Sequence, residues 1–182
     1  MDKPVLILVP HRCLRSPPPQ CDVSAERYAE RLQRLLVEAG CTTLELHMSN
    51  EYRWQCDPNR ATCKNAPMRQ AGHVFLKEHR QDARIVEIHS FPNAASWDDR
   101  VPSDSQAVVL TMHPGADTLE ERVLRETGAA ALQGDRVIND IGYEAQRNGW
   151  GKRHVLLEMR WNLTQQEADT ILAGVVRALA EK

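Results

Sequence analysis

Short apolar runs alternate along this chain with longer segments of helical periodicity, and this alternation constrains the fold more than any other feature. Val5–Val9 is a wholly aliphatic run closed by Pro10, which is typical of a strand buried on both faces. From Ser24 to Ala39 apolar residues recur every three or four positions, and Gly40 can end that helix. Strands that alternate with helices form a largely parallel sheet covered by helices. We therefore expect an α/β fold, with three α/β/α layers and a mostly parallel mixed sheet.

The same patterns place the other elements. The last helix is expected to begin at the capping box Thr164–Glu167 and to run through Leu179. The other helices are expected over residues 24–39, 67–79 and 118–127, and the strands over residues 5–9, 42–47, 84–89, 107–111, 137–139 and 154–159.

Composition and charge exclude several classes of protein. The chain has 182 residues, of which 42% are hydrophobic and 26% charged, so residues 1–182 suffice for one domain with a core of its own. Lys and Arg number 23 against 25 Asp and Glu, a net charge of −2 that favours neither nucleic acid nor an anionic membrane as a partner. No apolar run approaches the ~18 residues of a membrane-spanning helix, and the short first run after Asp2 is unlike a signal peptide.

The cysteines favour a reducing compartment. There are five, an odd number, and no two have C-x-x-C spacing. A disulfide framework is unusual in a chain of this length that lacks a signal peptide. We therefore expect reduced cysteines in a cytoplasmic protein.

Several expected strands run directly into chemically capable side chains. His11 follows the first strand, His89 ends the third, and Glu158 lies near the end of the last. Ligands of open α/β sheets bind beyond the carboxyl ends of the strands, so these side chains should lie together. Zinc binds imidazole and carboxylate and keeps one position for water, which indicates a metal hydrolase. Glu87 should share a strand face with His89 as a partner for it, although a single histidine in such a place is also compatible with a purely structural role.

Arg53–Arg60 concentrates polar groups after a strand. The segment reads R-W-Q-C-D-P-N-R, with two guanidinium groups, an amide and a carboxylate. Arginine is the side chain best shaped for bidentate binding of a carboxylate. The alternative interpretation is a surface loop in which Asp57 and Pro58 begin a turn.

Four short motifs, in this order, resemble the N-formylglutamate amidohydrolase family of the zinc carboxypeptidase and aspartoacylase superfamily. They are the V-P-H of 9–11, the R-x-x-x-D-x-N-R of 53–60, the I-H-S-F of 88–91 and the closing strand and turn of 155–163. The resemblance covers nearly the whole chain. It implies a three-layer fold of the zinc carboxypeptidase type, also called phosphorylase/hydrolase-like, with one zinc ion.

The resemblance implies that His11 and His89 bind zinc but leaves the third ligand open. The H-x-x-E pair of the superfamily is absent, because Leu14 stands three positions after His11. Asp22 is the first candidate, with a helix N-cap as its alternative role. Cys13 is the second, with a small buried thiol as its alternative.

The resemblance also assigns substrate and catalytic roles. Asn59 and Arg60 would hold a substrate carboxylate, with Arg160 as a further binding residue. Arg53 would lie near the scissile carbonyl, and Glu158 would be the general base.

The expected function is a zinc-dependent hydrolase that cleaves the amide bond of a small N-acyl, formyl-like amino acid or of a short peptide, with water activated by zinc and Glu158. A binding protein that keeps the fold without catalysis, and a zinc peptidase, stay open as alternatives. His113 precedes a Pro-Gly turn, and His154 begins a strand at the end away from the site. The glycine-containing segment 148–151 indicates a mobile loop that could cover the site.

Overall fold

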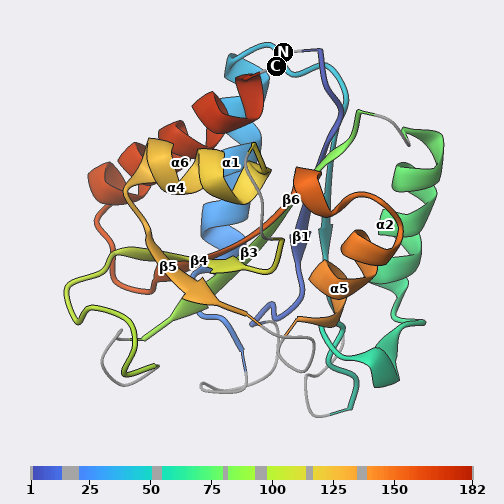
Figure 1. Cartoon of the computed structure of the whole chain (residues 1–182), viewed down its shortest axis with the longest axis horizontal. Coiled ribbons are helices and arrows are strands. Elements are labelled where there is room, and N and C mark those ends of the chain that lie inside the picture. The colour runs from blue at the N-terminus through green and yellow to red at the C-terminus, as the bar shows by residue number, and fades with distance from the viewer. Residues whose placement is uncertain are drawn as a thin grey trace.

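In the described part of the chain, six strands form one sheet in the order β2-β1-β3-β6-β4-β5 (Figure 1). The computed structural model describes residues 2–13, 21–50, 55–79, 82–92, 98–113, 117–134 and 139–181. The strands are β1 (Val5–Val9), β2 (Leu44–Met48), β3 (Arg84–Phe91), β4 (Ala107–Thr111), β5 (Ala130–Gln133) and β6 (His154–Arg160).

Strand directions create two chemically different ends of this sheet. The strands β2, β1, β3 and β6 are parallel, whereas β4 is antiparallel to β6 and β5 is parallel to β4. We call the end where β1, β3 and β6 finish the carboxyl end. The other, the amino end, holds the start of β6 and the finish of β4. The expected mostly parallel mixed sheet is therefore confirmed.

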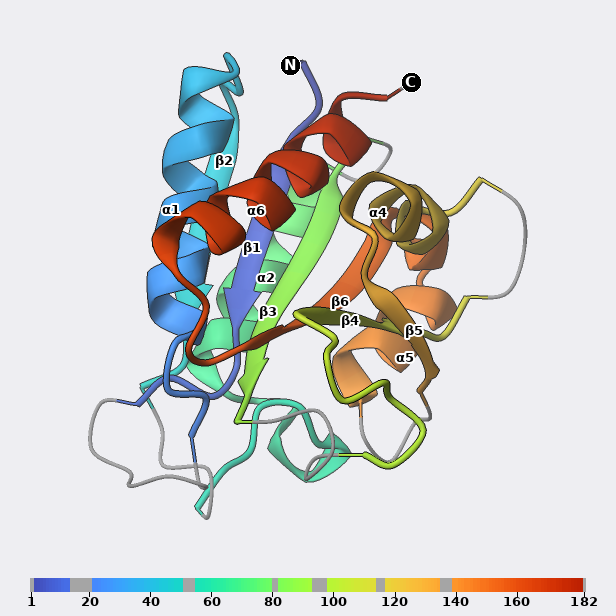
Figure 2. The ribbon, with the colours of Figure 1, turned by 90° about the vertical axis from the view of Figure 1, so that its left-hand side faces the viewer.

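Helices cover both faces of the sheet, which gives three layers (Figures 1 and 2). One face packs against α1 (Ala25–Glu38), α4 (Leu119–Thr127) and α6 (Gln165–Ala180). The other face packs against α2 (Pro67–Glu78) and α5 (Asp140–Arg147). Two short 3-10 turns, η1 (Ala61–Cys63) and η2 (Gly151–Arg153), complete the described elements.

The central strand β1 shows why the sheet is buried on both sides. Alternate residues point to opposite faces of a strand. The odd-numbered residues of β1 pack in one core cluster with Tyr28 of α1, and Leu6 and Leu8 pack in another with Phe75 of α2. Each such side chain contributes about 1.5–3 kcal/mol when it is fully buried. Burial of both faces explains why the strand carries no polar residue.

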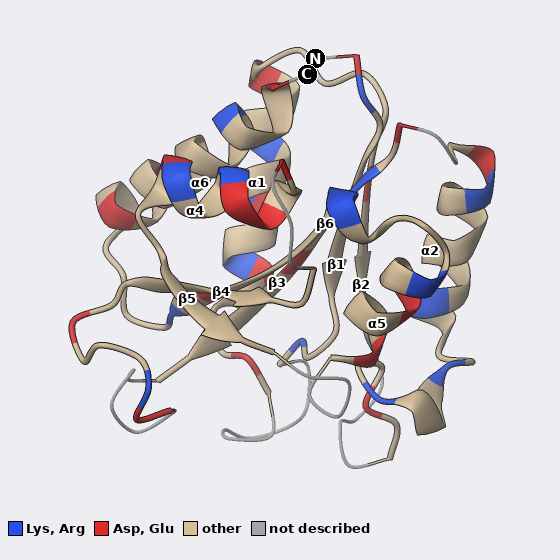
Figure 3. Cartoon of the chain, viewed as in Figure 1, with Lys and Arg blue, Asp and Glu red and all other residues tan. Residues whose placement is uncertain are grey.

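Charged side chains of both signs are spread over the helices (Figure 3), in keeping with the net charge of −2. Some of them join helices, as where Nε of Arg31 in α1 donates to Asp169 of α6 over 2.7 Å. None of the described helices combines the length and the apolar character needed to cross a bilayer.

The expected strand over residues 137–139 is not where the structure places β5. Residues 137 and 138 lie outside the described residues, and Asn139 caps α5 by accepting a hydrogen bond from the Gly142 amide over 2.7 Å. The strand next to β4 is Ala130–Gln133, which follows α4 after a left-handed Gly128. It buries only Leu132, so its apolar signal in the sequence is weak.

The expectation that residues 148–151 cover the carboxyl end of the sheet is wrong. Asn148 ends α5 and Gly151 begins η2, which leads directly into the start of β6. The segment therefore lies at the amino end. Trp150 packs there against the core cluster under α2 and α5, because the short helix α5 turns the chain back over that face.

The expectation of reduced cysteines is wrong for four of the five. Cys13 pairs with Cys21 and Cys56 with Cys63, at Cα separations of 5.1 and 5.4 Å that suit a disulfide, while Cys41 is free and buried. Each pair closes a short loop, with sequence separations of 8 and 7 residues. Neither spacing is that of a C-x-x-C motif, so the sequence carried no local signal for these pairs.

Candidate metal centre

His11, Asp22 and His89 meet at the carboxyl end of the sheet. His89 lies on β3, His11 stands two residues beyond β1, and Asp22 precedes α1. Oδ2 of Asp22 is 2.8 Å from Nδ1 of His89 and 3.3 Å from Nδ1 of His11. All three side chains are buried. One carboxylate oxygen and two imidazole nitrogens thus face a common point, as ligands of a metal ion would.

Local backbone contacts hold Asp22 in this position. Its amide donates to the carbonyl of His11 over 2.8 Å, and the Cys13–Cys21 disulfide closes the chain between the two residues. The N-cap of α1 is Ser24, so the alternative role of Asp22 as a helix cap is wrong. Cys13 as a ligand is also wrong, because its sulfur is bonded to Cys21 and offers no thiolate.

Carboxylates also lie against the outer nitrogens of both imidazoles. Nε2 of His11 is 2.8 Å from Oδ1 of Asp57, and Nε2 of His89 is 3.5 Å from Oε1 of Glu87. At His11, the carboxylate of Asp57 on Nε2 favours the proton there and leaves the lone pair on Nδ1, as metal-binding histidines require. At His89 the closer contact is the one between Nδ1 and Asp22. The expected pairing of Glu87 with His89 is present. The contact of Asp57 with His11 is one that the sequence analysis missed.

The electrostatics of the cluster favour a cation. Burial alone would raise the pKa of Asp22, but hydrogen bonds from His11 and His89 outweigh it and hold that pKa well below its usual range. Burial alone would lower the pKa of His89, but Asp22 and Glu87 raise it well above the usual value. The cluster therefore has an affinity for positive charge, which a proton satisfies when no metal ion is bound.

Glu158 stands beside this cluster. The register of β6 against β3 pairs Glu158 with His89, and its negative charge contributes to the raised pKa of that histidine. It is 8% exposed. A carboxylate in this place can accept a proton from a water molecule next to the cluster.

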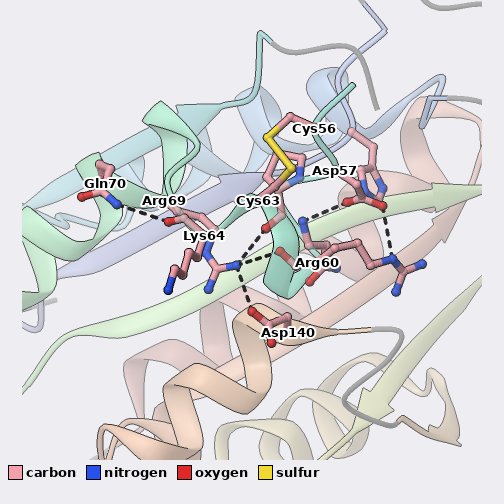
Figure 4. The surroundings of a disulfide bond; sticks show 11 residues. Cys56, Asp57, Arg60, Cys63, Lys64, Arg69, Gln70 and Asp140 are labelled. Atoms are coloured by element: carbon pink, nitrogen blue, oxygen red, sulfur yellow. Dashed lines mark hydrogen bonds and ion pairs between the residues drawn. A yellow bond between two sulfur atoms is a disulfide. The ribbon is translucent and has the colours of Figure 1, made fainter. Parts of the chain in front are cut away.

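The Cys56–Cys63 disulfide closes a loop that carries Asp57 and Arg60 (Figure 4). Contacts of Asp57 with His11 and of Asn59 with His89 place this loop beside the cluster. Oδ1 of Asp57 accepts the Asn59 amide over 2.9 Å, and its Oδ2 lies 3.4 Å from Nε of Arg60. Nη1 of Arg69 lies within hydrogen-bonding distance of the carbonyl of Arg60 and of Asp140 in α5, at 3.3 and 3.0 Å. Arg69 thus links the loop of Asp57 and Arg60 to α5, a role that the sequence did not indicate.

The expected substrate-binding residues differ in how open they are. The Arg60 side chain is 36% exposed, whereas Asn59 is buried, with Nδ2 3.5 Å from Nε2 of His89 and Oδ1 accepting the Ile141 amide. Arg160 donates from Nη2 to the Ser103 carbonyl over 2.7 Å. Arg53 lies outside the described residues. Among the described residues of this group, Arg60 is partly exposed and contacts Asp57, which itself contacts His11.

Comparisons with known proteins agree with this architecture. No protein-family model and no curated protein matches the chain. A gene product of Agrobacterium tumefaciens matches over 97% of this chain and 88% of its own, with 15% identity and a TM-score of 0.69. N-formylglutamate amidohydrolase from Ralstonia eutropha matches over 98% and 90%, with 16% identity and a TM-score of 0.57. A bacteriophage poly-gamma-glutamate hydrolase matches over 97% and 83%, with 17% identity and a TM-score of 0.56.

At these identities the likeness concerns the fold. This chain has the α/β fold of hydrolases that include a formylglutamate amidohydrolase, which confirms the expected fold.

Proposed function

We propose that this chain is a zinc-dependent hydrolase that cleaves the amide bond of a small N-acyl amino acid or a short peptide. The observation that carries the proposal is the convergence of Nδ1 of His11, Nδ1 of His89 and Oδ2 of Asp22, with a carboxylate against each outer imidazole nitrogen. The fold shared with N-formylglutamate amidohydrolase and poly-gamma-glutamate hydrolase supports it, since both act on glutamate-derived amides by name.

The donor set fits zinc. Two imidazoles and one carboxylate are a common set of protein ligands in catalytic zinc sites, which keep a further position open. A bound zinc ion would polarise the amide carbonyl and lower the pKa of water to about 7. His11, His89 and Asp22 would hold the ion, while Asp57 and Glu87 would fix the two imidazole rings.

The residues around the cluster supply the other steps. Glu158 takes a proton from the attacking water and delivers it to the amine nitrogen as the C–N bond breaks. Arg60, which is partly exposed and lies 3.4 Å from Asp57, binds the carboxylate of the substrate. Asn59, whose Nδ2 lies 3.5 Å from Nε2 of His89, is assigned to the same carboxylate. Arg53 remains assigned to the scissile carbonyl, and Arg160 to substrate in competition with its bond to Ser103.

The test combines metal content with turnover. We expect the purified wild-type protein to bind zinc at the carboxyl end and His89→Ala to lose that zinc. We also expect the wild type to hydrolyse at least one of a panel of N-formyl, N-acetyl and N-succinyl amino acids. Glu158→Gln should keep the zinc and lose about 10²–10⁴-fold in turnover. Glu45→Gln on β2, where the side chain is 46% exposed, is the matched control.

Two outcomes would redirect the assignment. If Glu158→Gln turned over substrate within a few-fold of the wild-type rate, Glu158 would not be the general base. Zinc at this cluster with no turnover of the panel would direct the search to short γ-glutamyl peptides, because a hydrolase of poly-gamma-glutamate shares the fold. No zinc at this cluster after metal is added back would leave a binding protein that keeps the fold.

A further inference from the structure

A second group of ligand-forming side chains lies at the amino end of the sheet, away from the centre described above. His113 stands two residues beyond β4, Glu120 lies in the first turn of α4, and His154 is the first residue of β6. All three are buried, His154 completely. They meet because β4 is antiparallel to β6, so that the finish of one strand lies beside the start of the other.

The three side chains are close enough to share one ion. One ligand atom from each lies within 4.8 Å of the others, and Nε2 of His113 is 3.8 Å from Oε1 of Glu120. The two imidazole rings meet edge to face with their centroids 5.6 Å apart.

Several of their nitrogens are buried without a hydrogen-bond partner. Among the described residues, this holds for both ring nitrogens of His113 and for Nδ1 of His154. A buried polar atom without a partner is costly, and native proteins rarely keep three in one place. An ion between the rings would satisfy Nε2 of His113 and Nδ1 of His154 together.

The surrounding residues fix the donors in the orientation that an ion requires. Nε2 of His154 lies 2.7 Å from Oε2 of Glu87, which leaves the lone pair of that ring on Nδ1. The carboxylate of Glu120 accepts the backbone amides of Met112 and His113 at 3.0–3.1 Å. Nδ1 of His113 lies close to Gly151: a Cβ atom added to that glycine would be only 2.8 Å from the nitrogen. There is therefore no room for an ion at Nδ1, and Nε2 is the ring nitrogen that can bind one.

We propose that Nε2 of His113, Nδ1 of His154 and the carboxylate of Glu120 bind a divalent transition-metal ion, with zinc the best match to this donor set. The ion joins the end of β4, the start of α4 and the start of β6, and water completes its coordination. Glu120 and the adjacent Glu87 balance its two charges. Because the ion would tie three separate elements of the fold together, we assign it a structural role, and its presence does not depend on the function proposed for the carboxyl end.

The direct test uses the wild-type protein. Crystals of zinc-loaded protein measured at the zinc absorption edge should show an anomalous peak between His113 and His154, at about 2.0–2.1 Å from each donor nitrogen. Metal analysis should give one zinc from this site in addition to that of the carboxyl end. A water molecule in place of the peak, or no density, would overturn the proposal. This test needs no variant, so it holds even if the substitutions below prevent folding.

Variants separate the two sites. His113→Phe keeps a ring of similar size and removes a side chain that makes no hydrogen bond in the described structure. It should lose the zinc of the amino end only, and His89→Ala that of the carboxyl end only. His47→Phe, on the edge strand β2, is the control and should lose neither.

The possible results are distinguishable. One zinc that His89→Ala loses and His113→Phe keeps would overturn the second site and support the first. One zinc with the reverse behaviour would support the second site and overturn the first. No zinc in the loaded wild type would overturn both.

Discussion

Two histidine clusters at opposite ends of one sheet use the same donor types in different surroundings. At the carboxyl end, every ring nitrogen of His11 and His89 lies within 3.5 Å of a carboxylate. At the amino end, His113 has no hydrogen-bonded nitrogen in the described structure and His154 has one. The charges of the first cluster can be balanced by a proton as well as by a metal ion. The second cluster leaves three ring nitrogens without a hydrogen-bond partner, which agrees with the ion proposed there.

Glu87 connects these two clusters. Its Oε2 lies 2.7 Å from Nε2 of His154, and its Oε1 lies 3.5 Å from Nε2 of His89. Burial alone would raise the pKa of Glu87, but the hydrogen bonds from His154 and His89 lower it to about 2, so the carboxylate stays ionised. One buried carboxylate therefore contacts an imidazole of each cluster, with the shorter contact to His154.

The largest effect is expected from Asp22→Asn, which removes the carboxylate shared by the two histidines of the carboxyl end. Zinc affinity there should fall by more than the ~10–100-fold that loss of an outer partner costs, and turnover should fall with it. The amino end should keep its ion. Competition with a zinc chelator measures both, and the exposed Asp82→Asn is the control. Unchanged affinity in Asp22→Asn would mean that a different third ligand is used.

Much of the carboxyl end was predictable from the sequence, because its histidines follow apolar runs. A buried parallel strand has a recognisable pattern, and the residue after it lies at the ligand-binding end by topology. This reasoning predicted that His11, His89 and Glu158 lie near one another, as the structure has them. Asp22 could be proposed only from its place before a helix, and the contact between His11 and Asp57 joins positions 46 residues apart in the sequence.

The amino end could not be predicted in the same way. His113 and His154 meet only because β4 runs antiparallel to β6, and no local pattern in the sequence specifies strand direction. The helix α5 was missed because it is short and half polar, and the strand β5 because it has four residues and buries only Leu132. Disulfide pairing likewise depends on loop geometry, which composition does not contain.

The next largest effect is expected from the double variant Cys13→Ser with Cys21→Ser, because this bond closes the loop between His11 and Asp22. Loss of a disulfide that closes a loop this short should lower the free energy of unfolding by about 2–3 kcal/mol. Zinc should bind more weakly at the carboxyl end and equally well at the amino end. Urea unfolding and metal titration test this, with Cys41→Ala as the control for loss of a cysteine. An unchanged unfolding midpoint would show that the loop is held without the bond.

A smaller effect is expected from Asp57→Asn. The amide can still accept a hydrogen bond from His11 but no longer offers a negative charge to that ring or to Arg60. Zinc affinity at the carboxyl end should fall about 10–100-fold. The affinity for a substrate that carries a free carboxylate should also fall, whereas the affinity for an analogue in which that carboxylate is amidated should not change. Asp98→Asn, which breaks a surface pair with Arg100, is the matched control. Equal losses in both variants would contradict a specific role for Asp57.

The smallest effect concerns the support of the carboxyl-end loop from α5. Hydrogen bonds from His73 and, to a smaller extent, from Arg69 lower the pKa of Glu144 to about 2. Together they outweigh burial, which would raise that pKa. The unfolded value is about 4.3, so the carboxylate adds stability above that pH and loses it as the pH falls toward 2. With the side chain 30% exposed, we expect about 1–2 kcal/mol.

Urea unfolding as a function of pH measures this contribution. The difference between wild type and Glu144→Gln should be largest near neutral pH and should disappear near pH 2, whereas the exposed Glu38→Gln on α1 should give a curve close to that of wild type. Arg69 also contacts Asp140, which gives it a second carboxylate partner on α5. Parallel curves for wild type and Glu144→Gln would therefore mean that Arg69 holds the loop of Asp57 and Arg60 through Asp140 alone.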